Sequence, residues 1–175
     1  MTYKETLIDA MRWLAEQSDT IFVGQTVTYG GSYMGTTFAK VPESKKVEFG
    51  VMEETQMGIS LGLALEGYCV ISLYPRFDFL LLAMSQLVNH IDKIGWMSDG
   101  KMRPRIIIRT SVGPKKPLDA GPQHTGRYTN AFKEMLTTVN VVELASAEMV
   151  APYYRRAYED QDLRLWLFVE DGSQY

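Results

Sequence analysis

The chain has 175 residues, the usual size of one domain, and its 46% hydrophobic content is ordinary for a globular protein. A formal net charge of −3 without a basic face argues against a nucleic-acid binder, and no segment approaches the ~20 consecutive apolar residues that span a bilayer. The single cysteine, Cys69, excludes an internal disulfide, and residues 1–5 lack the apolar stretch of a signal peptide, so we expect a soluble, cytoplasmic protein.

Short β-branched runs alternate with helical patterns, which favours a mainly parallel sheet covered by helices. The predicted elements are a helix over 2–17, a strand over 20–24, a helix over 54–65, a strand over 68–73, a helix over 77–94, a strand over 105–109, a helix over 128–136, a strand over 139–143, a helix over 147–158 and a strand over 163–169. The predicted fold class is therefore α/β, with three layers, in a single domain over residues 1–175. Cys69 falls within a predicted strand, which favours a small buried thiol over a nucleophile.

Two loops stand out between these elements. One spans 28–40 and is rich in glycine, threonine and serine, and the other spans 110–127 and contains His124. A loop as long as the second is usually functional or disordered. Ligands of open parallel sheets bind at the carboxyl ends of the strands. We therefore expect the loops after Gly24, Leu73 and Arg109 to share one edge.

Several common sites are excluded by motif. Two histidines, His90 and His124, and one cysteine cannot make a standard structural zinc site. The chain has no Gly-x-Gly-x-x-Gly, no P-loop and no Gly-x-Ser-x-Gly elbow. These motifs alone therefore indicate no more than an α/β domain with an unusual loop around His124.

The segment 50–67 carries a more informative pattern. Glu53 stands where an extended segment meets a predicted helix, and that helix carries Gly58 and Gly62 one turn apart. The spacing is Glu-x4-Gly-Φ-x-x-Gly, where Φ is apolar. One interpretation is a first-turn glutamate favoured by the helix dipole, on a helix whose small residues allow close packing.

The same pattern resembles the pyrimidine-binding domain of thiamine-diphosphate enzymes. More closely, the chain is similar to the beta subunit of the pyruvate and branched-chain 2-oxo acid dehydrogenase E1 components. The resemblance covers nearly the whole chain and continues through the segments 77–79 (Phe-Asp-Phe), 86–89 (Gln-Leu-Val-Asn), 96–100 (Trp-Met-Ser-Asp-Gly) and 123–125 (Gln-His-Thr). It implies the thiamine-diphosphate-binding fold of pyrimidine type.

The resemblance also implies roles for individual residues. Glu53 matches the carboxyl group that hydrogen-bonds the aminopyrimidine ring of thiamine diphosphate and promotes the tautomer that removes the thiazolium proton. Its neighbour Glu54 is the alternative. Phe79 matches the ring that stacks on the pyrimidine, although a core phenylalanine is an equal interpretation. His124 matches a histidine that steers substrate or acyl transfer, whereas a lone loop histidine is usually just exposed.

Three departures from the family pattern shape the expected assembly. Gln25, which we include among the cofactor-binding residues, replaces an acid that the family uses in proton communication between paired active sites. Lys115 and Lys116 suggest a different or more anionic substrate. The family's second, C-terminal domain does not follow Tyr175, so we expect none here.

The magnesium-binding side of the cofactor is also missing from the chain. The Gly-Asp-Gly…Asn motif that holds Mg2+ against the diphosphate has no match. We therefore expect an alpha-like partner subunit that brings the Mg2+ and diphosphate site, in a heterotetramer of two chains of each kind, with the cofactor between unlike chains.

The expected activity is decarboxylation of a small 2-oxo acid and transfer of the acyl or aldehyde unit. Carboligation and transketolase-like ketol transfer from a ketose are alternatives. So are a regulatory or assembly subunit without catalysis, and a flavodoxin-like domain that uses His124 in an unrelated site.

Overall fold

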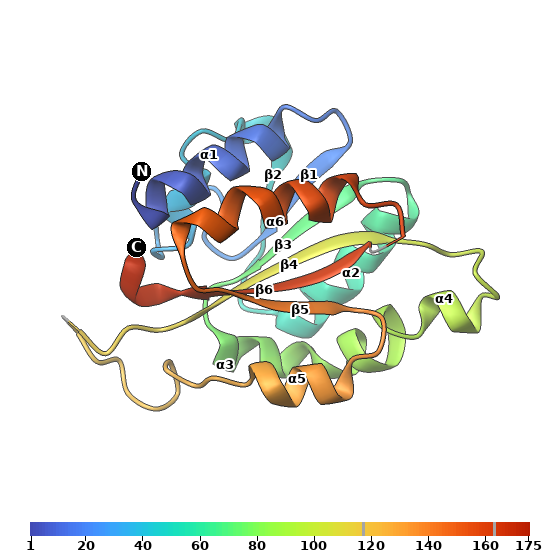
Figure 1. Ribbon diagram of the computed structural model, residues 1–175. Helices are drawn as coiled ribbons and strands as arrows, with labels where there is room; N and C mark the ends of the chain where they lie inside the picture. The colour runs from blue at the N-terminus through green and yellow to red at the C-terminus, as the bar shows by residue number, and fades with distance from the viewer. Residues whose placement is uncertain (117, 163) are drawn as a thin grey trace.

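A parallel sheet between two helical layers forms the centre of the computed structural model, which describes residues 1–116, 118–162 and 164–175 (Figure 1). The strands are β1 (Thr20–Gly24), β2 (Lys46–Glu48), β3 (Cys69–Tyr74), β4 (Arg105–Val112), β5 (Asn140–Leu144) and β6 (Leu165–Asp171). Their order is β2-β1-β3-β4-β6-β5, and every adjacent pair is parallel. The α/β prediction is confirmed.

The two helical layers cover opposite faces of the sheet. Helices α1 (Tyr3–Ala15) and α6 (Ala147–Glu159) lie on one face, and α2 (Glu53–Leu65), α3 (Phe77–Leu80) and α5 (Thr129–Met135) lie on the other (Figure 1).

The thiol of Cys69 in β3 is completely buried, as the sequence predicted. Burial raises the pKa of Cys69 to about 12, so the thiol is unreactive at neutral pH. Among the described residues, no helix is long and apolar enough to cross a membrane.

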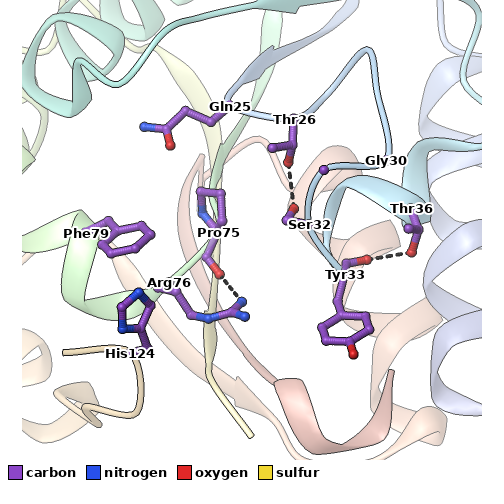
Figure 2. A pocket seen from close by; sticks show the side chains of 11 residues that line it. Gln25, Thr26, Gly30, Ser32, Tyr33, Thr36, Pro75, Arg76, Phe79 and His124 are labelled. Carbon is purple, nitrogen blue, oxygen red and sulfur yellow. Dashed lines mark hydrogen bonds between the residues drawn. The ribbon is translucent and has the colours of Figure 1, made fainter. Parts of the chain in front are cut away.

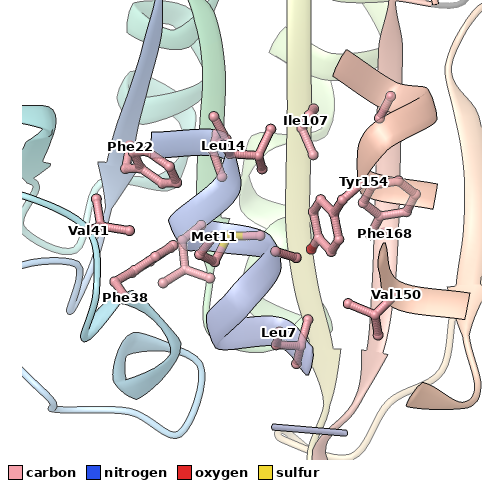
Figure 3. Close-up of a cluster of buried hydrophobic side chains, with 14 of the residues drawn as sticks. Leu7, Met11, Leu14, Phe22, Phe38, Val41, Ile107, Val150, Tyr154 and Phe168 are labelled. Carbon is pink, nitrogen blue, oxygen red and sulfur yellow. The ribbon is translucent and has the colours of Figure 1, made fainter. Parts of the chain in front are cut away.

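The strand register explains why the interior strands are apolar on both sides. One row of directly paired residues runs across the sheet: Phe22, Ile71, Ile107 and Trp166. These side chains pack against the layer of α1 and α6, and Figure 3 shows part of this cluster. The row before it in β3, β4 and β6 contributes to the opposite core: Val70, Ile106 and Leu165. Successive side chains alternate between the faces, so a strand covered on both sides needs apolar residues at consecutive positions.

The single helix predicted over 77–94 is wrong. That stretch forms α3, a 3-10 turn over Leu81–Ala83, a π-helix over Gln86–Ile91 and then α4 (Ile94–Met97). The Asp92 amide donates to the carbonyl of Leu87, five residues back. This wider turn brings Asp92 into a buried position, where its carboxylate accepts the main-chain N–H groups of Thr137 (2.9 Å) and Thr138 (2.7 Å).

One strand prediction was too short, and one strand was not predicted. Strand β4 continues beyond the predicted end at Arg109, because Ser111 and Val112 pair with Glu170 and Asp171 of β6. Strand β2 was not predicted, since three residues at the edge of a sheet give too short an alternation to recognise. The predicted strand start at Leu163 and the loop residue Pro117 lie outside the described residues.

A buried ion pair joins the carboxyl ends of β4 and β6. Arg109 donates from Nε to Glu170 Oε1 (2.7 Å) and from Nη2 to Oε2 (3.0 Å), and both side chains are completely buried. Nη1 donates to the Thr37 hydroxyl at 3.1 Å, and the Tyr154 hydroxyl donates to Glu170 Oε1 at 2.6 Å. Burial disfavours the guanidinium charge, but the facing Glu170 outweighs it and raises the pKa of Arg109.

Removing one partner of this pair should be costly. Arg109→Met leaves the Glu170 carboxylate buried without its cation, and we expect the free energy of unfolding to fall by about 3–5 kcal/mol in urea denaturation. The double variant Arg109→Met/Glu170→Met should recover part of that loss, because no charge is then left unpaired. As the control, Arg12→Met breaks an exposed 3.8 Å contact with Asp9 and should cost less than about 1 kcal/mol. Equal losses in the single and double variants would contradict this account.

Candidate functional site

A cavity of about 480 Å³ opens where the carboxyl ends of β1, β3 and β4 meet (Figure 2). Its described lining comes from the loop after β1, from the start of the helix after β3 and from the loop after β4: Gln25, Thr26, Gly30, Gly31, Ser32, Tyr33, Thr36, Pro75, Arg76, Phe79 and His124. The expectation that these three loops share one edge is confirmed. Three of the four predicted site residues therefore face one space.

Glu53, the fourth predicted residue, adjoins the cavity through Gln25. Glu53 begins α2 and is only 5% exposed, whereas Glu54 is exposed to solvent. Gln25 Nε2 donates to Glu53 Oε1 at 3.1 Å. Within the described residues, Glu53 Oε2 has no hydrogen-bond partner. One carboxylate oxygen is thus held by an amide, and the other has no partner among the described residues.

The chain places Gln25 by a close approach between β1 and β3. Gly24 has φ +140°, and a Cβ there would lie 2.4 Å from the Leu73 carbonyl oxygen, so this position requires glycine. The loop that follows is held by the Glu48 carboxylate of β2, which accepts the main-chain N–H groups of Thr26 (2.5 Å) and Thr28 (2.9 Å). The unpredicted edge strand therefore fixes one wall of the cavity.

Two contacts fix the loop that carries His124. The Gly113 amide donates to the His124 carbonyl at 3.0 Å, and the Asp78 carboxylate accepts the Gly126 amide at 3.1 Å. The His124 ring meets the Phe79 ring edge to face, with centroids 5.4 Å apart. His124 Nδ1 is buried and has no hydrogen-bond partner in the described residues. A buried polar atom at a cavity wall, left unpaired, is suited to a ligand.

Sequence reasoning missed Arg76, the cation in this wall. Its Nη1 donates to the Pro75 carbonyl (2.7 Å) and to the Ser111 hydroxyl (3.3 Å). Lys115 and Lys116, which the sequence suggested for an anionic substrate, are exposed and do not line the cavity. The signal for Arg76 was its place just after a buried strand, where ligands of parallel sheets bind.

Part of the arrangement fits a flat nitrogen heterocycle. Glu53 offers a carboxylate for a ring nitrogen, and the half-buried Phe79 offers an aromatic surface. By contrast, the described part of the chain contains no group of three or more histidine, cysteine or acidic side chains that could hold a metal ion. The residues present therefore fit the pyrimidine end of thiamine diphosphate.

Comparison with known proteins agrees with this geometry. Residues 1–172 match the family model described as "Transketolase, pyrimidine binding domain". The chain is 27% identical over 157 residues to the pyruvate dehydrogenase E1 component subunit beta of Rickettsia bellii. The match covers 87% of this chain and 45% of that protein, so the chain spans less than half the length of this curated relative.

Solved structures support the fold. A transketolase from Leishmania mexicana has a TM-score of 0.75 at 14% identity, covering 98% of this chain and 25% of the other. A structure described as a split gene transketolase, inactive beta4 tetramer, has a TM-score of 0.62 at 14% identity, covering 97% of this chain and 51% of the other. At such low identity these two likenesses concern the fold alone.

The tight end of β1 gives a test of how the site is positioned. Gly24→Ala adds a Cβ against the Leu73 carbonyl and forces alanine into φ +140°, so we expect a loss of about 2–3 kcal/mol in the free energy of unfolding of the isolated chain. The matched control is Gly62→Ala on α2, where a Cβ meets nothing within 4 Å; we expect a gain of roughly 0.5–1 kcal/mol from helix propensity. Similar effects from both changes would show that the close approach at Gly24 does not matter.

Proposed function

This chain belongs to the family of transketolase pyrimidine-binding domains, and we propose that it is the pyrimidine-binding, beta-like subunit of a thiamine-diphosphate-dependent enzyme. The proposed reaction is decarboxylation of a 2-oxo acid followed by transfer of the acyl or aldehyde unit. The observation that carries the proposal is the Glu53 carboxylate: it is almost buried, begins a helix, accepts a hydrogen bond from Gln25 and adjoins a cavity lined by Phe79 and His124.

Each of these residues has a distinct role in the proposal. When bound, thiamine diphosphate supplies a nucleophilic carbon for attack on a carbonyl group. Glu53 holds or releases a proton at Oε2, while the amide of Gln25 keeps Oε1 an acceptor. Phe79 gives the pyrimidine an aromatic surface, and the edge contact with His124 restrains that ring. In the proposal, Glu53, Gln25 and Phe79 bind and orient the pyrimidine ring.

His124 is proposed to act on the substrate rather than on the cofactor. Its main chain is fixed to Gly113, so the ring does not depend on a mobile loop for its position. The unpaired Nδ1 supports a hydrogen bond to a substrate oxygen at the cavity wall. In the proposal, this bond steers the substrate or assists acyl transfer.

The proposed enzyme needs an alpha-like partner subunit. Support comes from the lack of a Gly-Asp-Gly motif in the sequence and from the names of two similar proteins, a dehydrogenase "subunit beta" and a "split gene" transketolase. We propose that the partner supplies Mg2+ and the diphosphate ligands, in a two-fold heterotetramer. The face of α2 that carries Gly58 and Gly62 is our candidate for the contact between subunits. Gly62 is exposed with open space around it, and a Cβ at Gly58 would meet only the Gln86 side chain, at 3.7 Å.

Ketol transfer of the transketolase type is the second candidate reaction. It is favoured by the cation Arg76 within the cavity, because ketose phosphates carry a dianionic group. A regulatory subunit without catalysis is less well supported, since a role limited to assembly does not require a nearly buried carboxylate beside the cavity. Product analysis of the assembled enzyme with a 2-oxo acid and with a ketose phosphate separates the two reactions.

Glu53→Gln tests the central assignment. An amide has nearly the same shape as the carboxyl group but cannot exchange the proton. The thiazolium C2 proton of bound cofactor should therefore exchange about 10²–10⁴-fold more slowly in the assembled enzyme. The rate is measured by dilution into D2O, quenching with acid and NMR of the released cofactor. Glu54→Gln is the matched control and should exchange like the unaltered protein, because Glu54 faces solvent. Slow exchange in Glu54→Gln with normal exchange in Glu53→Gln would reassign the role.

Calorimetry tests the need for a partner. The chain alone offers one stacking surface and a few hydrogen bonds to thiamine diphosphate, too little to offset the entropic cost of association. We therefore expect no binding at micromolar concentration by the chain alone, and tight Mg2+-dependent binding after the partner is added. Tight Mg2+-dependent binding by the isolated chain would overturn the proposed division of the site.

A further inference from the structure

Arg76 is a partly buried arginine in the wall of the cavity. Arg105, which is also partly buried, faces Asp19, and the completely buried Arg109 faces Glu170. Arg76, by contrast, has no acidic oxygen within 4.0 Å among the described residues, although it is half-buried in the cavity wall. Desolvation by this burial lowers the pKa of the Arg76 guanidinium below its ordinary value. Its positive charge is therefore only partly compensated.

The donors of Arg76 are also incompletely used. A guanidinium carries five N–H donors. Nη1 is bonded to Pro75 and Ser111, Nε is buried without a partner, and Nη2 has no partner in the described residues. The two Nη1 bonds hold the side chain against the wall. Nη2 is left for a group that enters the cavity.

A second unpaired atom lies in the same wall. His124 Nδ1 is buried without a partner, and a Cβ at Gly113 would meet both the His124 carbonyl (2.1 Å) and Arg76 Nε (3.1 Å). Gly113 thus lets the His124 segment and the guanidinium approach each other. In the view of Figure 2, Arg76 lies between the His124 ring and Tyr33 of the loop after β1. An imidazole and a guanidinium on one wall form a surface suited to an anion.

We propose that Arg76 binds the anionic group of the substrate, a carboxylate or a phosphate, and so determines which substrates the enzyme accepts. The proposal rests on the function proposed above, since it places the substrate in the cavity beside Phe79 and His124. Charge-assisted hydrogen bonds from Nη2 orient the anion, and the carbonyl of the same molecule is then directed toward the part of the cavity near Gln25 and Glu53. Arg76 is a binding residue in this scheme and takes no part in proton transfer.

Arg76→Gln in the assembled, cofactor-loaded enzyme tests the proposal. Initial rates are measured with pyruvate, with a ketose phosphate and with the same ketose lacking its phosphate. Loss of the charged donor should raise KM roughly 10- to 100-fold for the substrate whose anion it binds, with kcat and cofactor affinity unchanged. A rise for pyruvate alone identifies a carboxylate, and a rise for the ketose phosphate alone identifies a phosphate. The neutral ketose should be unaffected.

Two further variants separate anion binding from support of the wall. Arg76→Lys keeps the positive charge, so its KM should lie much closer to that of the unaltered enzyme than to that of Arg76→Gln. If Arg76 only supports the wall through its bonds to Pro75 and Ser111, the KM should not depend on whether the new residue is charged. Lys101→Gln removes an exposed cation and should behave like the unaltered enzyme. Unchanged KM values for both anions in an Arg76→Gln enzyme that folds and binds cofactor normally would overturn the proposal.

A measurement without cofactor keeps this result distinct from failure of the proposed function. The full chain is titrated with inorganic phosphate and with acetate at constant ionic strength, and the Arg76 side-chain 15Nε resonance is followed by NMR, assigned by its absence in Arg76→Gln. A saturable shift supports the anion site even if the assembled protein binds no thiamine diphosphate. That lack of cofactor binding would contradict only the proposed function. Absence of a saturable shift, together with unchanged KM values, counts against Arg76 and leaves the proposed function standing.

Discussion

A buried cation constrains the carboxyl end of the sheet. Arg109 is tolerated there only because Glu170 faces it on the adjacent strand, so β4 and β6 must keep their register up to that level. Arg109 also donates to Thr37, which belongs to the 3-10 turn over Gly35–Phe38. The neighbouring residue of that turn, Thr36, lines the cavity. An ion pair packed beneath α1 and α6 therefore helps to position a wall of the candidate site.

Gln25 is the hydrogen-bond partner of the Glu53 carboxylate, and it determines the charge next to that group. A glutamine at position 25 donates one N–H and adds no charge, whereas an acid there would share a proton with Glu53 or repel it. At this point the present chain has no titratable group. In the proposed function, proton transfer at Glu53 therefore involves no second acid from position 25.

The sequence was sufficient where a local pattern and the tertiary environment agree. Apolar β-branched runs predicted the central strands, and the spacing from Glu53 to Gly58 predicted the carboxylate that the fold nearly buries. It was insufficient where distant residues decide. Polar residues such as Ser111 resemble a loop until Glu170 and Asp171 pair with that segment, and the π-turn before Asp92 depends on the N–H groups of Thr137 and Thr138. Arg76 belongs to no motif, and only the structure shows that this cation lines the cavity without an ion pair among the described residues.

The two ends of the chain lie side by side at one edge of the molecule (Figure 1). The rings of Tyr3 and Tyr175 are 6.1 Å apart, and the Tyr3 hydroxyl donates to the Leu144 carbonyl at 2.7 Å. A short peptide can therefore join residue 1 to residue 175 without crossing the sheet. The resulting ring can be cut at an exposed turn such as Gly100, which has φ +72° and open space around it. The architecture is thus suited to circular permutation, in which the order of elements along the polypeptide changes while the packed core does not.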